Sequence, residues 1–226
     1  MSKQSKRILV VCYLPGSIER TRATILHHLR VLEYSEAGHD LVYYNTFDEA
    51  PYSLPAEKTP NRDLSGELRG QRFDAVLLHY TFLSVRTVGY PFYSWKPRFA
   101  WMADLDCPRI AIPQDEGNYA EVLDEWLDEL RVSAVFSVHY KENGPLYPST
   151  CQRAHMLPCL PGYVDTNMAK RCVERARPVA ERPHDIVYRA RRLAHRFGRA
   201  GQRKHDIADR VLEVAPQMGL NVDIST

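Results

Sequence analysis

The amino-acid sequence predicts an α/β fold, in which a Rossmann-like open parallel sheet with helices on both faces is followed by the start of a second β-α-β domain. Two observations lead to this prediction. Apolar runs of strand length recur along the chain without in/out alternation, as expected for parallel strands that are covered on both faces. Between several of these runs, apolar residues recur at helical spacing, and strands that alternate with helices are typical of α/β domains.

The first β-α-β unit opens the chain. Residues 8–13 are a branched, almost unbroken apolar run that predicts a buried strand ending before Gly16. From Glu19 onward the apolar residues follow a helical period, and Gly38 is a typical helix stop. A second strand is expected at 41–44, which completes the unit.

Three further strands and one strongly patterned helix follow. Residues 119–130 carry an apolar stripe at helical spacing, and we expect the acidic residues of this helix to face solvent. The connection at 50–70 is expected to be irregular, and the aromatic, proline-broken segment at 90–103 to hold a loop and a short helix. The expected strands are 73–79, 109–113 and 134–138.

The β-α-β rhythm starts again near the end of the sequence. We expect residues 1–165 to form the Rossmann-like domain, 166–184 a linker and 185–226 the start of a second domain. A parallel unit this small cannot bury both of its faces. We therefore expect the second domain to be incomplete and its free strand edge to favour self-association. Its expected elements are a strand at 186–188, a helix at 207–215 and a strand at 220–224.

Composition excludes several classes of protein. With 44% hydrophobic and 26% charged residues, the 226-residue chain fits a globular rather than a disordered protein. A net charge of +2, and basic stretches without interleaved aromatic residues, disfavour nucleic-acid binding. Five cysteines without a C-x-x-C pair suit a reduced, cytoplasmic protein. No apolar run reaches the roughly 18 residues that a membrane span needs, so we expect no membrane-spanning helix.

Metal binding is not expected either. Cys151, His155 and Cys159 are spaced four apart, but Pro158 interrupts the helix that this spacing would need, and no fourth ligand is evident. The sequence thus predicts neither a metal nor a cofactor.

Polar residues follow three of the expected strands at the point where each ends. These residues are His79, Asp115 with Glu116, and His139. Because parallel strands finish at the same edge of a sheet, two imidazoles and two carboxylates are expected to converge there. A base near neutral pH with a carboxylate to orient it suits deprotonation of a hydroxyl, so these four are the candidate catalytic residues. The alternative is that each is a structural polar group, with Asp115 or Glu116 capping the next helix.

The turn after the first strand is a candidate binding loop. Gly16 would let a ligand or a facing domain approach the backbone, and Ser17 could cap the following helix. The alternative is a simple strand-to-helix turn. No G-x-G-x-x-G pattern is present, which disfavours the usual dinucleotide site.

A basic segment near the end of the chain is a candidate diphosphate site. Arg189, Arg191 and Arg192 follow an expected strand, and Lys204 lies near the start of an expected helix. The alternative is a solvated basic face.

The stretches FDAVLLHY, RIAIPQDEG and AVFSVH, together with DIVYRARRL and GRAGQRKHDIADRV, resemble GT-B glycosyltransferases of the glycogen-synthase-like superfamily. The resemblance covers most of the chain, but it lies in pattern and short motifs. It implies an N-terminal domain that binds the acceptor and a C-terminal domain that binds the nucleotide sugar. It also implies that Gly16, Arg189 and Lys204 lie near the donor diphosphate, with Arg191 and Arg192 as close rivals.

The implied reaction is transfer of a sugar from a nucleotide-diphosphate sugar to an acceptor hydroxyl, without a metal. No residue of the sequence matches the acidic donor motif of this family, so we expect the chain to be inactive alone. It could be a truncated form, a natural short form or the partner of a missing half. The rival hypothesis is a non-catalytic α/β module that binds a ligand or a partner protein. A hydrolase is disfavoured because no G-x-S-x-G elbow is present.

Overall fold

The computed structural model describes residues 4–14, 23–33, 38–49, 68, 70–139, 141, 143–159, 166–190, 192–193 and 195–225. Two compact units are distinguished, Met1–Val164 and Asp165–Thr226, and each is treated by itself.

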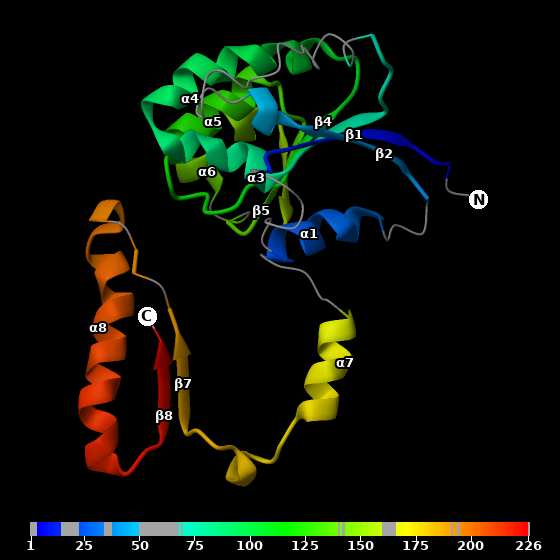
Figure 1. Cartoon of the computed structure of the whole chain (residues 1–226). Helices are drawn as coiled ribbons and strands as arrows, with labels where there is room; N and C mark the ends of the chain where they lie inside the picture. The colour runs from blue at the N-terminus through cyan, green and yellow to red at the C-terminus, as the bar shows by residue number, and fades with distance from the viewer. Residues whose placement is uncertain are drawn as a thin grey trace. The chain divides into compact units, whose positions relative to one another are not determined.

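The first unit is built on a six-stranded parallel sheet with strand order β2-β1-β3-β4-β5-β6 (Figure 1). Strand β1, which is next to the edge strand β2, pairs with β2 on one side, where Leu9 lies opposite Val42, and with β3 on the other, where Leu9 lies opposite Val76. This architecture confirms the predicted α/β fold class. The strands are β1 (Arg7–Cys12), β2 (Asp40–Asn45), β3 (Ala75–Leu78), β4 (Arg109–Ala111), β5 (Ala134–Ser137) and β6 (His155–Pro158).

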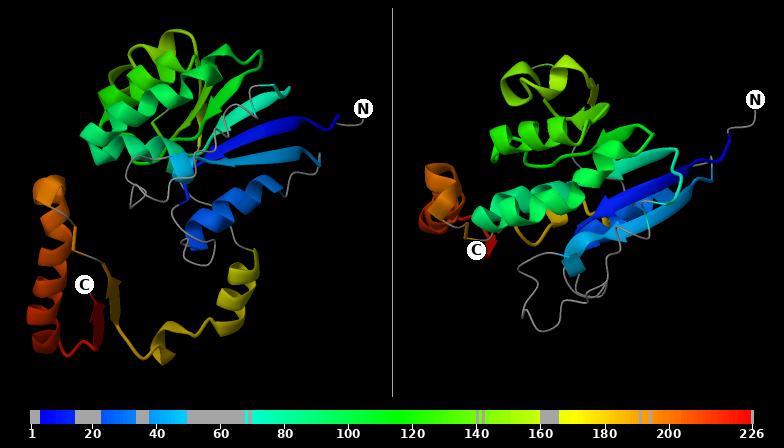
Figure 2. Two further views of the ribbon diagram at one scale, coloured as in Figure 1. Left: turned by 45° about the horizontal axis from the view of Figure 1, so that its top comes forward. Right: turned by 90° about the horizontal axis from the view of Figure 1, so that it is seen from above.

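Helices cover both faces of this sheet, as Figures 1 and 2 show for α1 on one face and α4 and α5 on the other. Strand β1 is buried on both sides because its residues alternate between two apolar cores. Leu9 and Val11 belong to the larger core, whereas Val10 and Cys12 pack with Leu29 of α1. The helices and 3-10 turns of this unit are α1 (Ala23–Glu33), η2 (Thr46–Glu49), α3 (Tyr80–Leu83), η4 (Ser84–Val88), α4 (Tyr90–Trp95), η5 (Lys96–Asp104), α5 (Ala120–Glu129), α6 (Asn143–Leu146) and η6 (Thr150–Gln152).

The larger core is strongly aromatic. The ring of Trp95 lies 4.3 Å from that of Phe99, and the ring of Phe82 lies 4.7 Å from that of Trp126, measured between centroids. The proline-broken segment predicted as a loop with a short helix thus forms α4 and η5 and supplies much of this core. Its prolines lie at the starts of these elements, where a missing N–H costs little.

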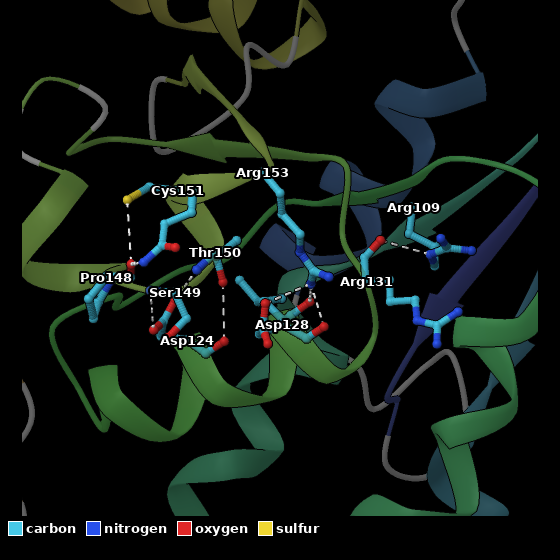
Figure 3. A network of polar contacts seen from close by, with 11 residues as sticks. Arg109, Asp124, Asp128, Arg131, Pro148, Ser149, Thr150, Cys151 and Arg153 are labelled. Carbon is cyan, nitrogen blue, oxygen red and sulfur yellow. Dashed lines mark hydrogen bonds and ion pairs between the residues drawn. The ribbon is translucent and has the colours of Figure 1, made fainter.

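Helix α5 confirms its predicted apolar stripe, since Leu123, Trp126 and Leu127 are buried. The expectation that all its acids face solvent is wrong for Asp124, which is only 3% exposed. The Asp124 carboxylate accepts the backbone N–H groups of Ser149 at 2.9 Å and Thr150 at 2.8 Å (Figure 3). This carboxylate therefore fastens the turn before β6 to α5.

Strand β6 was not predicted. His155 and Cys159 donate backbone hydrogen bonds to Ser133 and Ser137 at its two ends. Pro158 occupies the alternate position, where an N–H would point away from β5, so its missing donor does not interrupt the pairing. The proline that argued against a helix here is compatible with an edge strand.

The second unit contains a two-stranded parallel sheet of β7 (Ile186–Arg189) and β8 (Val222–Ser225), with α8 (Gly198–Val214) between them in sequence. Both strands agree with the prediction to within two residues, but α8 begins nine residues earlier than expected, at Gly198 rather than Ile207. The segment predicted as a linker contains α7 (Thr166–Arg175) and η7 (Val179–Glu181). The remaining turns are η8 (His195–Phe197) and η9 (Ala215–Met218).

In the described part of the chain, every helix falls short of the length and apolar character that crossing a membrane requires.

Candidate functional site

The strand order places a topological switch point between β1 and β3. From β1 the chain moves to β2 on one side of the sheet, and β3 then returns to the other side of β1. In open parallel sheets, ligands bind in the crevice outside the carboxyl ends of the strands at such a point. The groups that follow β1 and β3 therefore form the first candidate site.

The backbone that leaves β1 is held on both sides by side chains from its neighbours. The Tyr13 N–H donates to Thr81 Oγ1, which follows β3, at 3.0 Å. The Leu14 N–H donates to Asn45 Oδ1 at the end of β2 at 2.9 Å, and Asn45 Nδ2 donates back to the Leu14 carbonyl at 3.2 Å. These contacts fix where the next loop starts. The candidate residues Gly16 and Ser17 lie outside the described residues.

His79 follows β3 directly and is fully buried. Its Nδ1 accepts the Thr81 N–H at 3.2 Å, which caps α3, and lies 2.8 Å from Thr81 Oγ1. Its Nε2 lies 2.9 Å from Nδ1 of His28 in α1. Both ring nitrogens are thus occupied, so in this conformation His79 can reach a ligand only through His28. Burial, reinforced by the nearby His28, lowers the pKa of His79 to about 3.

His28 completes this pair from the facing helix and is half-buried. Its ring packs edge-on against the ring of Tyr80, with centroids 5.3 Å apart. Burial lowers the pKa of His28 as well. Both imidazoles are therefore neutral at physiological pH, and the switch point carries a neutral, hydrogen-bonded histidine pair rather than an imidazolium.

Asp115 lies in the loop that follows β4, where its side chain is exposed. The buried side chain of Arg86, which is 1% exposed, holds the backbone of this loop in place. The Arg86 guanidinium donates to the carbonyls of Asp115 at 3.0 Å, Asn118 at 3.1 Å and Leu83 at 2.9 Å. Asp115 and Tyr119 both have positive φ, at 52° and 53°, a conformation that L-residues adopt only when their surroundings enforce it. The buried arginine supplies that constraint.

Glu116 points the other way and is 3% exposed. Its carboxylate accepts the Ser137 hydroxyl at 2.5 Å, the Val138 N–H at 3.0 Å and the Tyr147 hydroxyl. Three protein donors thus engage both of its oxygens, and the carboxylate joins the segment after β4 to the end of β5. In this arrangement Glu116 acts as a structural carboxylate.

The fourth predicted residue, His139, is exposed just after β5, and its N–H donates to Ser137 Oγ at 2.9 Å. The predicted residues therefore do lie at the ends of adjacent strands, in the order β3, β4 and β5. Among these four described residues, no hydrogen bond or ion pair joins His79 to Asp115, Glu116 or His139. They divide into the histidine pair at the switch point and a second group at the β4 and β5 ends.

Two of the candidate basic residues of the second unit, Arg189 and Arg192, have side-chain partners within this unit. The Arg189 guanidinium pairs with the Asp223 carboxylate, which raises the pKa of Arg189 and lowers that of Asp223. Arg192 contacts His205 Nε2. Lys204 is exposed, but because α8 begins at Gly198, it lies in the second turn of this helix and not before its start as predicted. Arg191 lies outside the described residues.

Sequence reasoning missed the residues that support these positions, namely His28, Asn45, Thr81 and Arg86. Thr81 carried a usable signal, because a hydroxyl two residues after a strand-end histidine is suited to bonding its ring. Nothing in the local pattern around His28 distinguishes it from its neighbour His27. Across the described ranges, no group of three or more histidine, cysteine, aspartate or glutamate side chains is arranged to hold a metal.

Comparisons with protein-family models, with curated proteins and with solved structures return no match to this chain.

Proposed function

We propose that the protein takes part in sugar transfer, in which an acceptor hydroxyl attacks the anomeric carbon of a nucleotide-diphosphate sugar and the nucleoside diphosphate leaves. The observation that carries the proposal is the switch point between β1 and β3, with a neutral histidine pair beside it. Ligands of parallel α/β sheets bind at such a point, and uncharged imidazoles suit hydroxyl groups. The first unit would then hold the acceptor.

Considered by itself, the second unit offers cations that could bind a diphosphate. Lys204 is exposed in the second turn of α8, whereas Arg189 would have to exchange its Asp223 partner for a phosphate oxygen. Cations at this position would neutralise the leaving group without a metal. Lys204 is therefore the residue whose removal tests the proposal most directly.

A specific observation favours the rival hypothesis of a non-catalytic binding module. Both Glu116 and His79, two of the four predicted catalytic residues, are buried and have protein partners. Only Asp115 and His139 of that set are exposed. A rigid strand-end surface of this kind could serve binding without turnover.

Titration with UDP, GDP and ADP and their glucose or mannose conjugates, followed by calorimetry, separates the two hypotheses. Binding is the measured quantity because no residue of the sequence matches the acidic donor motif of the family. Sugar transfer predicts saturable binding that Lys204→Ala weakens about tenfold, since hydrogen bonds to charged groups contribute about 1.5–3 kcal/mol. Lys170→Ala, which removes an exposed lysine of the same unit, should leave binding unchanged. No binding at millimolar ligand would leave the binding module as the better hypothesis.

A further inference from the structure

A directed chain of hydrogen bonds runs from the backbone of β1 to His28. The Tyr13 N–H donates to Thr81 Oγ1 at 3.0 Å, so the hydroxyl hydrogen of Thr81 is free to donate to His79 Nδ1, 2.8 Å away. The Thr81 N–H donates to the same nitrogen at 3.2 Å. A ring nitrogen that accepts hydrogen bonds carries no proton, so these contacts assign the proton of neutral His79 to Nε2.

This assignment fixes the tautomer of the second ring. The His79 Nε2–H points at His28 Nδ1 across 2.9 Å, so Nδ1 of His28 is the acceptor and its proton lies on Nε2. The lone pair of His28 that could take up a proton is thus already occupied. Among the described residues, the hydrogen bond of His28 is the one at Nδ1. The series of hydrogen bonds therefore ends at the His28 Nε2–H group.

The surroundings of His28 keep it uncharged. Among the residues that the structure describes, the rings of His79 and Tyr80 lie against His28, and neither is charged at neutral pH. Burial lowers the pKa of His28. A protonated His28 would also bring two N–H groups face to face at the 2.9 Å contact with His79.

We infer that His28 contacts the ligand at the switch point, where it presents Nε2–H as a fixed, neutral hydrogen-bond donor to an uncharged oxygen, such as a sugar hydroxyl. His79 and Thr81 are positioning residues that hold the ring and its tautomer. This inference rests on the proposed function for the identity of the ligand, but the tautomer and the neutral state follow from the hydrogen bonds alone. A neutral donor brings no positive charge to the site, so it attracts an anion less strongly than an imidazolium would.

Nitrogen-detected NMR of the histidine rings tests the tautomers and the neutral state of His28 and His79 without any ligand. We expect His28 and His79 both as neutral Nε2–H tautomers at pH 7. In His79→Phe, His28 loses the donor that holds its Nδ1 as an acceptor, so the Nδ1–H tautomer of His28 should appear beside the Nε2–H form. A His28 ring that is protonated at Nδ1, or already charged at pH 7, would overturn the inference even if nucleotide binding through Lys204 were found.

The second half is tested by titrating the intact chain with methyl glucoside and methyl mannoside while following the His28 ring resonances. We expect these resonances to shift, and the affinity to change less than twofold between pH 6 and pH 8, because no proton is gained or lost. His28→Phe should weaken binding about fivefold, which is the effect of one neutral hydrogen bond. His28→Gln retains an N–H donor and should recover most of this loss.

Two results would refute the ligand assignment. One is the absence of any shift of the His28 resonances with either sugar, and the other is an affinity that falls more than fivefold from pH 6 to pH 8. Nucleotide binding is measured separately, with Lys204→Ala. A failure of the proposed nucleotide-sugar binding can therefore be distinguished from a failure of the proposed sugar contact at His28.

Discussion

Removal of the buried Asp124 carboxylate should destabilise the first unit strongly. This side chain accepts two backbone N–H groups, from Ser149 and Thr150, and is 3% exposed. In Asp124→Asn, one of the two donors faces an amide nitrogen instead of an oxygen, and the charge of the acceptor is lost. Hydrogen bonds to charged groups contribute about 1.5–3 kcal/mol, and a buried unsatisfied donor costs about 1–3 kcal/mol. We therefore expect a loss of about 3 kcal/mol.

Urea denaturation followed by tryptophan fluorescence measures this loss, because Trp95, Trp101 and Trp126 all belong to the first unit. The matched control is Asp128→Asn, one turn further along α5. Its carboxylate, 46% exposed, pairs with Arg153 at 3.0 Å (Figure 3). Exposed pairs contribute about 0–1 kcal/mol, so this variant should unfold almost as the parent does. Equal midpoints for Asp124→Asn and Asp128→Asn would refute the reasoning.

The Asp124 effect should also depend on pH. Burial by itself would raise the pKa of Asp124, but the hydrogen bonds from Thr150 and Ser149 bring it below the ordinary value. A lowered pKa in the folded state means that the stabilisation is fully present above the unfolded pKa, about 3.9, and is lost as pH falls through the folded value. The difference between the parent and Asp124→Asn should thus persist at pH 5 and shrink below about pH 4.

Three further predictions follow from other buried groups. Because His79 stays neutral in the folded state down to a pKa of about 3, the unfolded chain alone binds its proton below about pH 6.5, and stability should fall with decreasing pH. His79→Gln should remove about 1.4 kcal/mol per pH unit of that slope in urea titrations between about pH 6 and 4; an unchanged slope would contradict it. Glu116→Gln should cost about 2 kcal/mol, because its three donors lose a charged acceptor, whereas Gln in place of the exposed Glu121 should cost almost nothing. Gly201→Ala should lower the helicity of α8 by circular dichroism instead of raising it, because the added Cβ would lie 2.7 Å from Phe197 Cβ; Ala in place of the exposed Gln202 is the control.

The sheet could be predicted because a strand that is buried on both faces appears in the sequence as an uninterrupted apolar run. Residues 8–13 contain no polar side chain between apolar ones except the cysteine, and the structure buries this run between two cores. Helix α5 was predictable for the same reason, from its stripe. Strand β6 was missed because it is four residues long, begins with a histidine and ends with a proline. Only its pairing with β5 makes it a strand, and pairing partners are not visible locally.

The candidate site could be predicted less well, because topology determines which strand ends meet but not where each side chain points. Asp115 and Glu116 are adjacent in sequence, yet one is exposed and the other is buried against Tyr147. That division depends on Arg86, which is 29 residues away and holds the Asp115 carbonyl. His28 and His79 are 51 residues apart, and no local pattern shows that their rings meet.

The polar groups at the carboxyl edge of the sheet therefore have two physical roles. Asn45, Arg86 and Glu116 bond the backbones that leave the strands, so the loops start from fixed positions. Asp115 and His139 are exposed on top of this framework, and His28 ends a hydrogen-bond chain whose donors all point one way. A group held by a saturated network loses little freedom when it binds, which is the physical advantage of preorganisation. We therefore expect ligand recognition at this edge from Asp115, His139 and His28. We expect the groups that are bonded to the backbone, Asn45, Arg86 and Glu116, to determine stability.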